Sequence, residues 1–344
     1  MRCALYCPMN EPFDRSIKLL MVLYHRFELW NPPSWFAERL QSDFPRIELT
    51  HLARHEGVED TLRDAEVAIT WSLRPEQFKA AKRLRWIHSP AAAVHQLMFP
   101  ELVHSDVVLT NAREVHGPVV AEHVIAQILA MAKMLPEAVR LQQQHRWGQE
   151  NMWSGRPRPR EVAGATLGLV GLGSIGREVA QRAAALDMRV IAVREHPEKG
   201  SPHNVAAIFG LDQLEDLLRQ SDYVVLAAPL TAETRGMMNA DRLSRMKPDA
   251  CLINVSRGPL IDDVALATAL REKKIGGAAL DVFTEEPLFA ESPLWDLENV
   301  LITPHTAAVT EKLWDRHYAL IKENLRRYLA GEPLLAVVDK AKGY

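Results

Sequence analysis

The chain has 344 residues, which is too long for one ordinary hydrophobic core and predicts about two domains. Its composition, with 47% hydrophobic and 25% charged residues, is typical of a globular protein. A net charge of −3 gives no electrostatic basis for binding nucleic acid or an anionic membrane, and no apolar run is long enough to span a bilayer. The three cysteines cannot form a disulfide framework, so a reducing cytoplasm is the expected location.

The first third of the chain predicts an α/β region. After a loose extension of about 16 residues, in which Cys3 and Cys7 lack further ligands for a metal site, a helix is expected between Pro33 and Leu40. The expected strands span residues 17–23, 65–71, 84–88 and 107–110.

A long helix is predicted from Val119 to about Gln144, because apolar residues recur there at the spacing of one helix face. The polar, proline-containing residues 155–160 that follow are typical of a surface loop. His116 and His123 flank the start of the long helix, and we interpret both as structural.

Strands and helices alternate from residue 166 to about residue 304, which predicts a parallel sheet with helices on both faces. The expected strands span residues 167–170, 189–193, 223–227, 250–254, 277–280 and 300–303. A last amphipathic helix ends before Gly331 and Pro333, and we expect it to return to the first region. Its apolar face comprises Trp314, Tyr318, Ile321, Leu325 and Tyr328.

A glycine-rich turn lies between the strand at 166–170 and a run with helix propensity. Strand, glycine turn and helix in this order bind a dinucleotide pyrophosphate. Gly171 permits the tight turn, Gly173 lets the backbone approach the phosphates, and Gly176 lets the helix pack against the strand. Free N–H groups and the helix dipole then face the anion. A turn without a ligand is the alternative, but the strand at 189–193 completes the expected βαβ unit.

Four side chains near predicted strand ends suit chemistry at a carbonyl group or contact with the cofactor. Arg257 can hold a carboxylate by two parallel hydrogen bonds and polarise a neighbouring carbonyl. His305, paired with a carboxylate such as Glu286, can give a proton to a carbonyl that is being reduced. Asp281 ends a strand, where it can accept a hydrogen bond from a carboxamide. The alternatives are a surface arginine that caps a turn and a structural histidine.

Five segments, in this order and spacing, resemble the D-isomer-specific 2-hydroxyacid dehydrogenase family: residues 166–176, 222–236, 252–261, 279–288 and 293–310. The resemblance covers about residues 60–330. It implies an α/β fold in which a Rossmann-type doubly wound domain is inserted into a flavodoxin-like substrate domain, and usually a homodimer. The substrate domain is expected at 1–112 and 305–344, and the dinucleotide-binding domain at 113–304.

The resemblance also implies a reaction, hydride transfer between NAD(P)H and a small 2-oxo acid or D-2-hydroxy acid, and roles for single residues. Arg257 binds and polarises the 2-oxo acid, Glu286 orients the histidine, and His305 is the acid/base. Further cofactor contacts fall on Ser174, Ile175, Ala228, Pro229, Thr234, Val255 and Asp281.

The loop that grips the substrate carboxylate in this family departs from the usual pattern. In this chain the loop is residues 89–95, and Ala92, Ala93 and Val94 are the candidate carboxylate-binding residues. Ala93 stands where glycine is usual, and His95 where aspartate is common. Because alanine disfavours positive φ, we expect a loop of different shape and an altered choice of substrate.

A second departure concerns the cofactor. Arg194 stands about 18 residues beyond Gly176, where an acidic residue usually binds the ribose 2′-hydroxyl of NAD. A guanidinium attracts a 2′-phosphate, which favours NADP. Glu195 follows directly and can meet a ribose hydroxyl, so NAD stays open.

A dinucleotide-sensing scaffold is the alternative from another functional class. Some transcriptional corepressors share this fold and the same three catalytic residues, but they carry extended polar tails, and this chain ends soon after its last predicted helix. A formate dehydrogenase is disfavoured because that branch replaces the glutamate that Glu286 matches. Glyoxylate, hydroxypyruvate and bulkier 2-oxo acids all remain candidate substrates.

Overall fold

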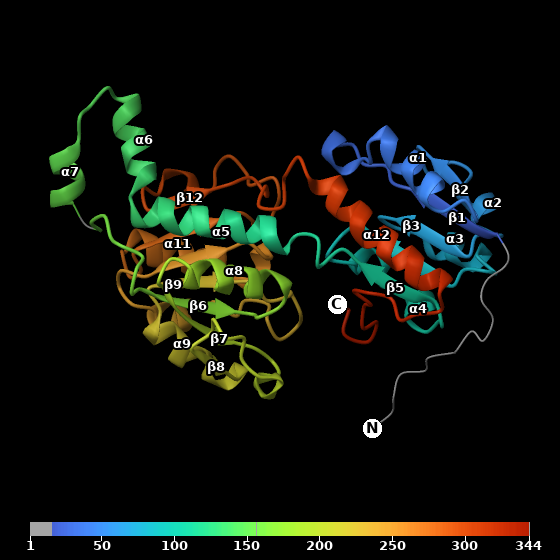
Figure 1. The fold of residues 1–344 in the computed structure, drawn as a ribbon. Coiled ribbons are helices and arrows are strands. Elements are labelled where there is room, and N and C mark those ends of the chain that lie inside the picture. Colours follow the sequence, from blue (N-terminus) through green and yellow to red (C-terminus); the bar gives the residue numbers. More distant parts are fainter. Residues whose placement is uncertain (1–15, 156, 344) are drawn as a thin grey trace. The chain divides into compact units, whose positions relative to one another are not determined.

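The computed structural model describes residues 16–155 and 157–343, and the chain divides into two units (Figure 1). Unit 1 contains Met1–Val115 and Thr310–Tyr344, and unit 2 contains His116–Val309. The sequence-based boundaries were drawn after residues 112 and 304, so His305, expected in the substrate domain, lies in unit 2. The expectations for the first 15 residues, including Cys3 and Cys7, fall outside the described residues.

Unit 1 is built on a five-stranded parallel sheet with the order β2-β1-β3-β4-β5, the flavodoxin-like order. Its strands are β1 (Ile17–Val22), β2 (Ile47–Leu52), β3 (Val67–Thr70), β4 (Trp86–Ser89) and β5 (Val108–Asn111). Four of them match predicted strands. Strand β2 was not predicted, because only Ile47 of this edge strand is buried and its other side chains are largely polar.

Alternate side chains of the unit 1 strands enter two separate cores, as the two-residue period of a strand requires. Leu19 and Met21 pack with helices α1 (Ser34–Asp43) and α12 (Leu313–Leu329), whereas Leu20 and Val22 enter the core on the other side. The latter core is covered by α2 (Val58–Leu62), α3 (Pro75–Ala80) and α4 (Pro100–Val103). The predicted return of the last helix to this region is thereby confirmed.

Unit 2 carries a seven-stranded parallel sheet in the order β12-β11-β10-β9-β6-β7-β8. Its strands are β6 (Thr166–Val170), β7 (Arg189–Val193), β8 (Ala207–Phe209), β9 (Tyr223–Leu226), β10 (Cys251–Asn254), β11 (Gly277–Leu280) and β12 (Val300–Ile302). This is the Rossmann order extended by one strand, so the predicted fold class is confirmed. Only β8, a three-residue edge strand, was not predicted.

Helices cover both faces of the unit 2 sheet. One core joins the strands to α5 (Gly117–Ala132) and α8 (Ser174–Ala184). The other joins them to α9 (Leu214–Gln220), α10 (Ala240–Ser244) and α11 (Asp263–Arg271). Cys251 is 3% exposed in the first core, as predicted.

The predicted helix from Val119 to Gln144 is wrong, because the chain forms two helices there. Helix α5 ends at Ala132, and α6 (Leu135–Gln143) continues at an angle of 66°. Met134 adopts a left-handed conformation with φ of 53°, and Pro136 has no N–H to donate to the preceding turn. No single helix of the described residues is long and apolar enough to cross a membrane.

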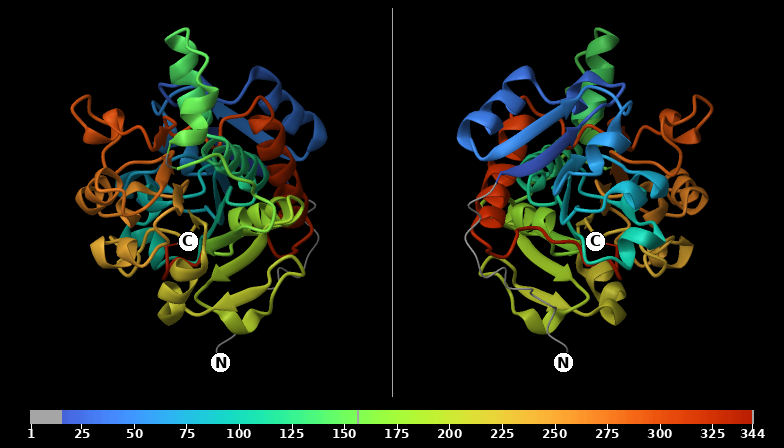
Figure 2. Two further views of the ribbon diagram at one scale, coloured as in Figure 1. Left: turned by 90° about the vertical axis from the view of Figure 1, so that its left-hand side faces the viewer. Right: turned by 90° about the vertical axis from the view of Figure 1, so that its right-hand side faces the viewer.

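Helix α6 and the short helix α7 (Gln149–Ser154) form an arm, residues 135–154, that extends away from the sheet of unit 2 (Figures 1 and 2). Trp147 and Trp153 on this arm are 93% and 64% exposed. Neither tryptophan therefore belongs to the core of its own chain.

Candidate active site

The glycine turn lies at the carboxyl end of β6, where the strand order of unit 2 reverses between β6 and β9. Ligands of open α/β sheets bind at this switch point. Gly171 has φ of 101°, and a Cβ on it would lie 2.7 Å from the Ala228 nitrogen. A Cβ on Gly176 would overlap the Gly171 carbonyl oxygen, whereas Gly173 has open space beside it. The first and third glycines thus allow close packing, and the second leaves room for a phosphate.

Helix α8 begins at Ser174, directly after the turn, and no side chain of its N-cap residue Gly173 is available to cap it. The N–H groups of a first helical turn have no partner within the helix, and the helix dipole is positive there. Val179, Ala180 and Ala183 bury the helix in the unit 2 core and hold its N-terminus in place. The donors and the open space at Gly173 fit a dinucleotide pyrophosphate.

The remaining cofactor candidates lie at the carboxyl ends of the neighbouring strands. Ala228 and Pro229 follow β9, and Thr234 donates a hydrogen bond of 2.8 Å from its hydroxyl to the Pro229 carbonyl. Val255 follows β10, and Ile175 is half-buried in the first turn of α8. These residues border the switch point, which is where a bound dinucleotide would run.

Arg194 directly follows β7, the strand next to β6. Its Nη1 donates to the Gly200 carbonyl at 3.3 Å. The carboxylate of Glu195 lies 3.6 Å from Nε2 of His196. The guanidinium therefore extends along the 194–200 loop, and the neighbouring carboxylate pairs with an imidazole.

His305 and Glu286 form a direct pair at the ends of β12 and β11. The His305 Nδ1 lies 2.6 Å from Oε2 of Glu286, and the two side chains are 49% and 34% exposed. The other carboxylate oxygen, Oε1, accepts from the Phe283 N–H at 3.0 Å. Because a carboxylate only accepts, Nδ1 is the donor in this pair, and Nε2 is the ring nitrogen left for a substrate.

The backbone of His305 is held in a left-handed conformation with φ of 53°. Its N–H donates to the Asp281 carbonyl at 2.9 Å. The buried Asp281 carboxylate accepts three more hydrogen bonds, from the N–H groups of Thr306 and Ala307 at 2.9 Å and from the Thr303 hydroxyl at 2.6 Å. Asp281 was expected as an acceptor for a cofactor carboxamide; in the structure its oxygens bind the turn that carries His305. These hydrogen bonds tie His305 to the end of β11 in unit 2.

Arg257 follows β10, which lies next to β11, and β11 lies next to β12 in the sheet. Its Nη1 donates to the Ser256 carbonyl at 2.6 Å. Burial lowers the pKa of the Arg257 guanidinium, and the negative charge of Glu286 opposes that shift. The three predicted catalytic residues thus come from three adjacent strands of one sheet, with Glu286 acting electrostatically on Arg257 and hydrogen-bonded to His305.

Two further residues that shape this site, Gly258 and Thr303, were not predicted from the sequence. A Cβ on Gly258 would overlap the carbonyl of Phe283, so only glycine lets the Arg257 turn approach the Glu286 segment. Thr303 links Asp281 to His123, whose Nε2 lies 3.1 Å from the Thr303 hydroxyl. Gly258 belongs to the Val-Ser-Arg-Gly segment and Thr303 to the Thr-Pro-His motif, and both motifs can be seen in the sequence. The contacts that give Gly258 and Thr303 their roles cannot.

The candidate carboxylate loop belongs to unit 1 and follows β4. Ala93 is not among the described residues with positive φ, so alanine fits this position without strain. The Val94 side chain is 1% exposed and belongs to the core, whereas Ala92 and Ala93 are half-buried. Within the described part of the chain, the N–H groups of Ala92 and Ala93 donate no hydrogen bond.

Comparisons with known proteins identify the relatives of this chain. The family model described as "D-isomer specific 2-hydroxyacid dehydrogenase, NAD binding domain" matches residues 125–307. A protein named glyoxylate reductase, from Pyrococcus furiosus, is 32% identical over 82% of this chain and 84% of its own length. A D-3-phosphoglycerate dehydrogenase from Synechocystis is 35% identical over 76% of this chain, but only 46% of its own length is covered.

A solved structure extends the likeness to three dimensions. The D-isomer specific 2-hydroxyacid dehydrogenase from Xanthobacter autotrophicus, in complex with NADPH and MES, matches with a TM-score of 0.80 and 32% identity, covering 96% of this chain and all of that chain. These relatives are named as oxidoreductases, and the dinucleotide-sensing scaffold is not favoured. The chain therefore belongs to the D-isomer-specific 2-hydroxyacid dehydrogenase family, NAD(P)-dependent oxidoreductases that transfer a hydride between the nicotinamide and a small 2-oxo or 2-hydroxy acid.

Proposed function

We propose that this protein reduces a small 2-oxo acid of the glyoxylate and hydroxypyruvate class, with NADPH preferred to NADH. The observation that carries the proposal is the His305–Glu286 pair at 2.6 Å, next to Arg257 in a sheet whose glycine turn fits a dinucleotide. The relative named glyoxylate reductase supports the substrate class.

His305 serves as the acid of the reduction. The bound nicotinamide supplies the hydride. Glu286 accepts from Nδ1 and so keeps the Nε2 side of the ring for the substrate oxygen, to which the histidine gives its proton. The Phe283 N–H fixes the second oxygen of Glu286, which limits rotation of the carboxylate and hence of the imidazole. In the reverse direction the same nitrogen takes the proton back.

Arg257 serves as the electrophile. Its guanidinium stays charged at physiological pH even where burial lowers its pKa, and it presents donors in a fixed fork. One edge of the fork polarises the carbonyl oxygen, on which negative charge grows as hydride arrives. The contact of Nη1 with the Ser256 carbonyl limits the rotation of this side chain.

The substrate carboxylate is assigned to the loop of Ala92, Ala93 and Val94. The undonated N–H groups of Ala92 and Ala93 support this assignment, because a carboxylate accepts well from consecutive backbone donors. Ala93 carries a methyl group that glycine lacks, and this added bulk in the candidate carboxylate loop supports a small 2-oxo acid as the substrate.

The preference for NADPH rests on Arg194. Its guanidinium follows the strand adjacent to the glycine turn, and the carboxylate of the next residue, Glu195, lies 3.6 Å from Nε2 of His196. The Xanthobacter structure is a complex with NADPH, which supports the proposal. The variant Arg194→Ala should raise the KM for NADPH about tenfold and leave the KM for NADH almost unchanged, because only NADPH carries a 2′-phosphate.

Initial rates of NADPH and NADH oxidation with glyoxylate, hydroxypyruvate, pyruvate and phenylpyruvate test the proposal directly. We expect turnover with the smaller acids and a higher kcat/KM with NADPH. The variants His305→Ala and Arg257→Ala should each lose several orders of magnitude in kcat while NADPH binding persists. Near-full activity of either variant would refute its assigned role, and faster turnover with phenylpyruvate would refute the substrate class.

We further propose that the protein is a homodimer that associates through the arm. Leu135, Val139, Trp147 and Trp153 expose large apolar surfaces on it, and such surfaces typically mark an association site. The variant Trp147→Glu should shift the sedimentation coefficient from that of a dimer to that of a monomer. A monomeric wild-type protein would refute the proposal.

A further inference from the structure

The side chain of Asn111 lies behind the candidate carboxylate loop. It stands at the end of β5, is 1% exposed, and donates from Nδ2 to the Ala92 carbonyl at 2.6 Å. The other end of the amide, Oδ1, accepts from the Arg113 N–H at 3.4 Å. The next residue in the chain contributes too, because the Ala112 N–H donates to the Ala91 carbonyl at 3.2 Å.

These two hydrogen bonds determine where two loop N–H groups point. The carbonyl of one residue and the N–H of the next belong to the same planar peptide unit and, in the trans form, point in opposite directions. A fixed Ala92 carbonyl therefore fixes the Ala93 N–H, and a fixed Ala91 carbonyl fixes the Ala92 N–H. Both N–H groups point away from β5, and neither donates within the described residues.

The end of β5 is itself held by a C-terminal strut, residues 333–340. The Asn111 N–H donates to the Ala336 carbonyl at 3.1 Å, and Thr110 forms an antiparallel bridge with Val337. Arg113 donates from Nη2 to the Val337 carbonyl at 2.9 Å. The strut thus acts as an extra edge partner of β5 at the point where Asn111 leaves the sheet.

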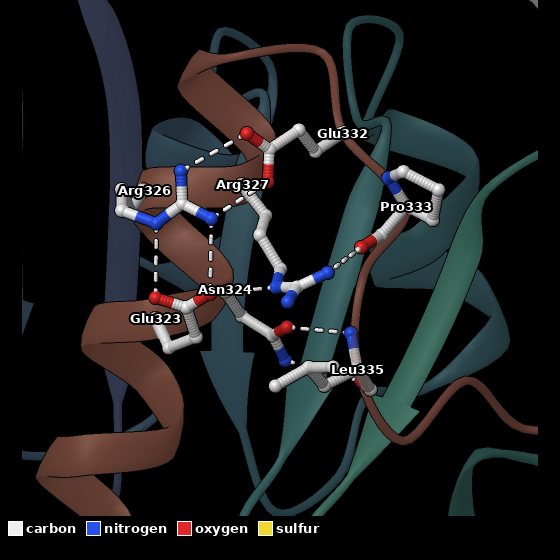
Figure 3. Close-up of polar contacts among 7 residues, drawn as sticks. All are labelled: Glu323, Asn324, Arg326, Arg327, Glu332, Pro333 and Leu335. Carbon is white, nitrogen blue, oxygen red and sulfur yellow. Dashed lines mark hydrogen bonds and ion pairs between the residues drawn. The ribbon is translucent and has the colours of Figure 1, made fainter.

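The strut is fastened to helix α12 by side chains (Figure 3). Asn324, fully buried on α12, accepts from the Leu335 N–H at 2.7 Å and donates to the Leu335 carbonyl at 3.2 Å. Arg327 donates to the Pro333 carbonyl at 3.0 Å, while Arg326 bridges Glu323 and Glu332. Because α12 packs in the unit 1 core, the strut has a rigid base.

We propose that Asn111 is a positioning residue for the 2-oxo acid: it orients the Ala92–Ala93 amides toward the substrate carboxylate, with the C-terminal strut as its support. The inference rests on the proposed function, in which this loop grips the carboxylate. Backbone N–H groups bind a ligand tightly when folding has already oriented them, because no conformational entropy is then lost to order the loop on binding.

Two substitutions of Asn111 separate its hydrogen bond to the Ala92 carbonyl from the volume of its side chain. Asn111→Asp keeps the size and the acceptor for the Arg113 N–H, but it places a carboxylate oxygen against the Ala92 carbonyl, so two acceptors repel. Asn111→Ala removes the bond and leaves the carbonyl without its donor. Asn299→Asp is the matched control, because the Nδ2 of Asn299 donates to the Leu270 carbonyl at 3.2 Å in unit 2.

The experiment measures the KM for glyoxylate, kcat, the Kd for NADPH, and amide hydrogen exchange of residues 91–95 with and without oxamate, a 2-oxo acid analogue that is not reduced. We expect Asn111→Ala to raise the KM about tenfold and Asn111→Asp to raise it further, with kcat within about threefold and the NADPH Kd within about twofold of wild type. Exchange of the loop should speed up, and protection by oxamate should weaken. Asn299→Asp should change none of these.

Three results would overturn the inference, and they differ in whether they also refute the assignment of the substrate carboxylate to the loop. Unchanged loop exchange and unchanged KM in both Asn111 variants would refute the positioning role alone. Faster loop exchange with unchanged KM and unchanged oxamate protection would show that the carboxylate binds elsewhere, which refutes the loop assignment as well. Equal loss of kcat, NADPH binding and melting temperature in the Asn111 variants would show a purely structural role. Exchange and oxamate protection need no turnover, so they decide the matter even if no acid in the panel is reduced.

Discussion

Replacing Asp281 by asparagine tests whether the turn that carries His305 depends on a carboxylate. Asp281 is 1% exposed, and its Oδ1 accepts from Thr306 and Thr303 while its Oδ2 accepts from Ala307. Asparagine keeps the size but has a single oxygen. If that oxygen takes the Oδ1 place, the new amide group faces the Ala307 N–H, donor against donor.

The magnitude follows from these contacts. One charge-assisted hydrogen bond contributes roughly 1.5–3 kcal/mol, and a buried donor left without a partner adds about 1–3 kcal/mol of cost. Since some relaxation is available, Asp281→Asn should lower the free energy of unfolding by about 2–4 kcal/mol. His305 holds a left-handed conformation that costs a non-glycine residue about 1–2 kcal/mol, so a weakened turn should relax and move the imidazole. A displacement of about 1 Å costs about 100-fold in kcat/KM.

The assay combines urea unfolding with steady-state kinetics. Asp262→Asn is the matched control, because Asp262 accepts a single hydrogen bond, from Ala265 at the start of α11, and asparagine caps helices equally well. We expect near wild-type stability and kinetics for the control, and losses in both for Asp281→Asn. An Asp281→Asn protein with wild-type unfolding and wild-type kcat/KM would refute the idea that this carboxylate holds the turn.

Three further predictions concern the cofactor turn and two buried groups. Gly176→Ala should abolish NADPH binding, measured by fluorescence titration, because its Cβ would overlap the Gly171 carbonyl; tight binding would contradict the turn geometry. Burial lowers the pKa of His88 to about 3. Below pH 6.5 the histidine is therefore protonated in the unfolded chain but stays neutral in the native state. For each unit by which the pH falls, this one histidine should lower the free energy of unfolding by about 1.4 kcal/mol. Urea unfolding between pH 7 and pH 5 should show that the free energy of unfolding falls less steeply with decreasing pH in His88→Gln than in the wild type, by about 1.4 kcal/mol per pH unit below pH 6.5. Equal pH dependence in the two proteins would refute the contribution of His88. Burial raises the pKa of the Cys251 thiol to about 12, so the peptide that contains it should resist iodoacetamide at pH 8 until urea is added. Rapid labelling of that peptide in the native protein would disprove its burial.

Local patterns in the sequence were sufficient for most of the architecture. The six predicted strands of unit 2 were found because fully buried strands are continuous apolar runs between turns. The edge strands β2 and β8 escaped, since neither is buried enough to show that signal. The break at Met134 was missed because the apolar spacing continues across it, although Pro136 marks the place.

In the candidate site, residues that belong to local sequence motifs could be predicted, whereas roles that depend on a partner far away in the chain could not. Arg257, Glu286 and His305 each follow a strand, and parallel strands bring their carboxyl ends to one edge, so their grouping was predictable from sequence. The roles of Gly258 and Asn111 were not, because each depends on a partner elsewhere in the chain, Phe283 for the first and Ala92 for the second. A contact between segments that are far apart in the chain produces no regular pattern of apolar residues in the sequence.

The split of unit 1 into two stretches of sequence has a consequence for synthesis. Residues 17–111 leave the ribosome first, but the apolar face of their sheet is completed by α12, which lies beyond residue 309. At ordinary elongation rates the intervening segment takes about 10 to 40 seconds to make. During that interval Phe36 lacks its contacts with Trp314 and Tyr318, and Trp86 lacks its contact with Tyr328, so the nascent chain exposes apolar side chains to solvent. Unit 2, which is continuous, can finish folding before unit 1 closes, and chaperones that shield apolar nascent chains should therefore engage this protein at its first domain.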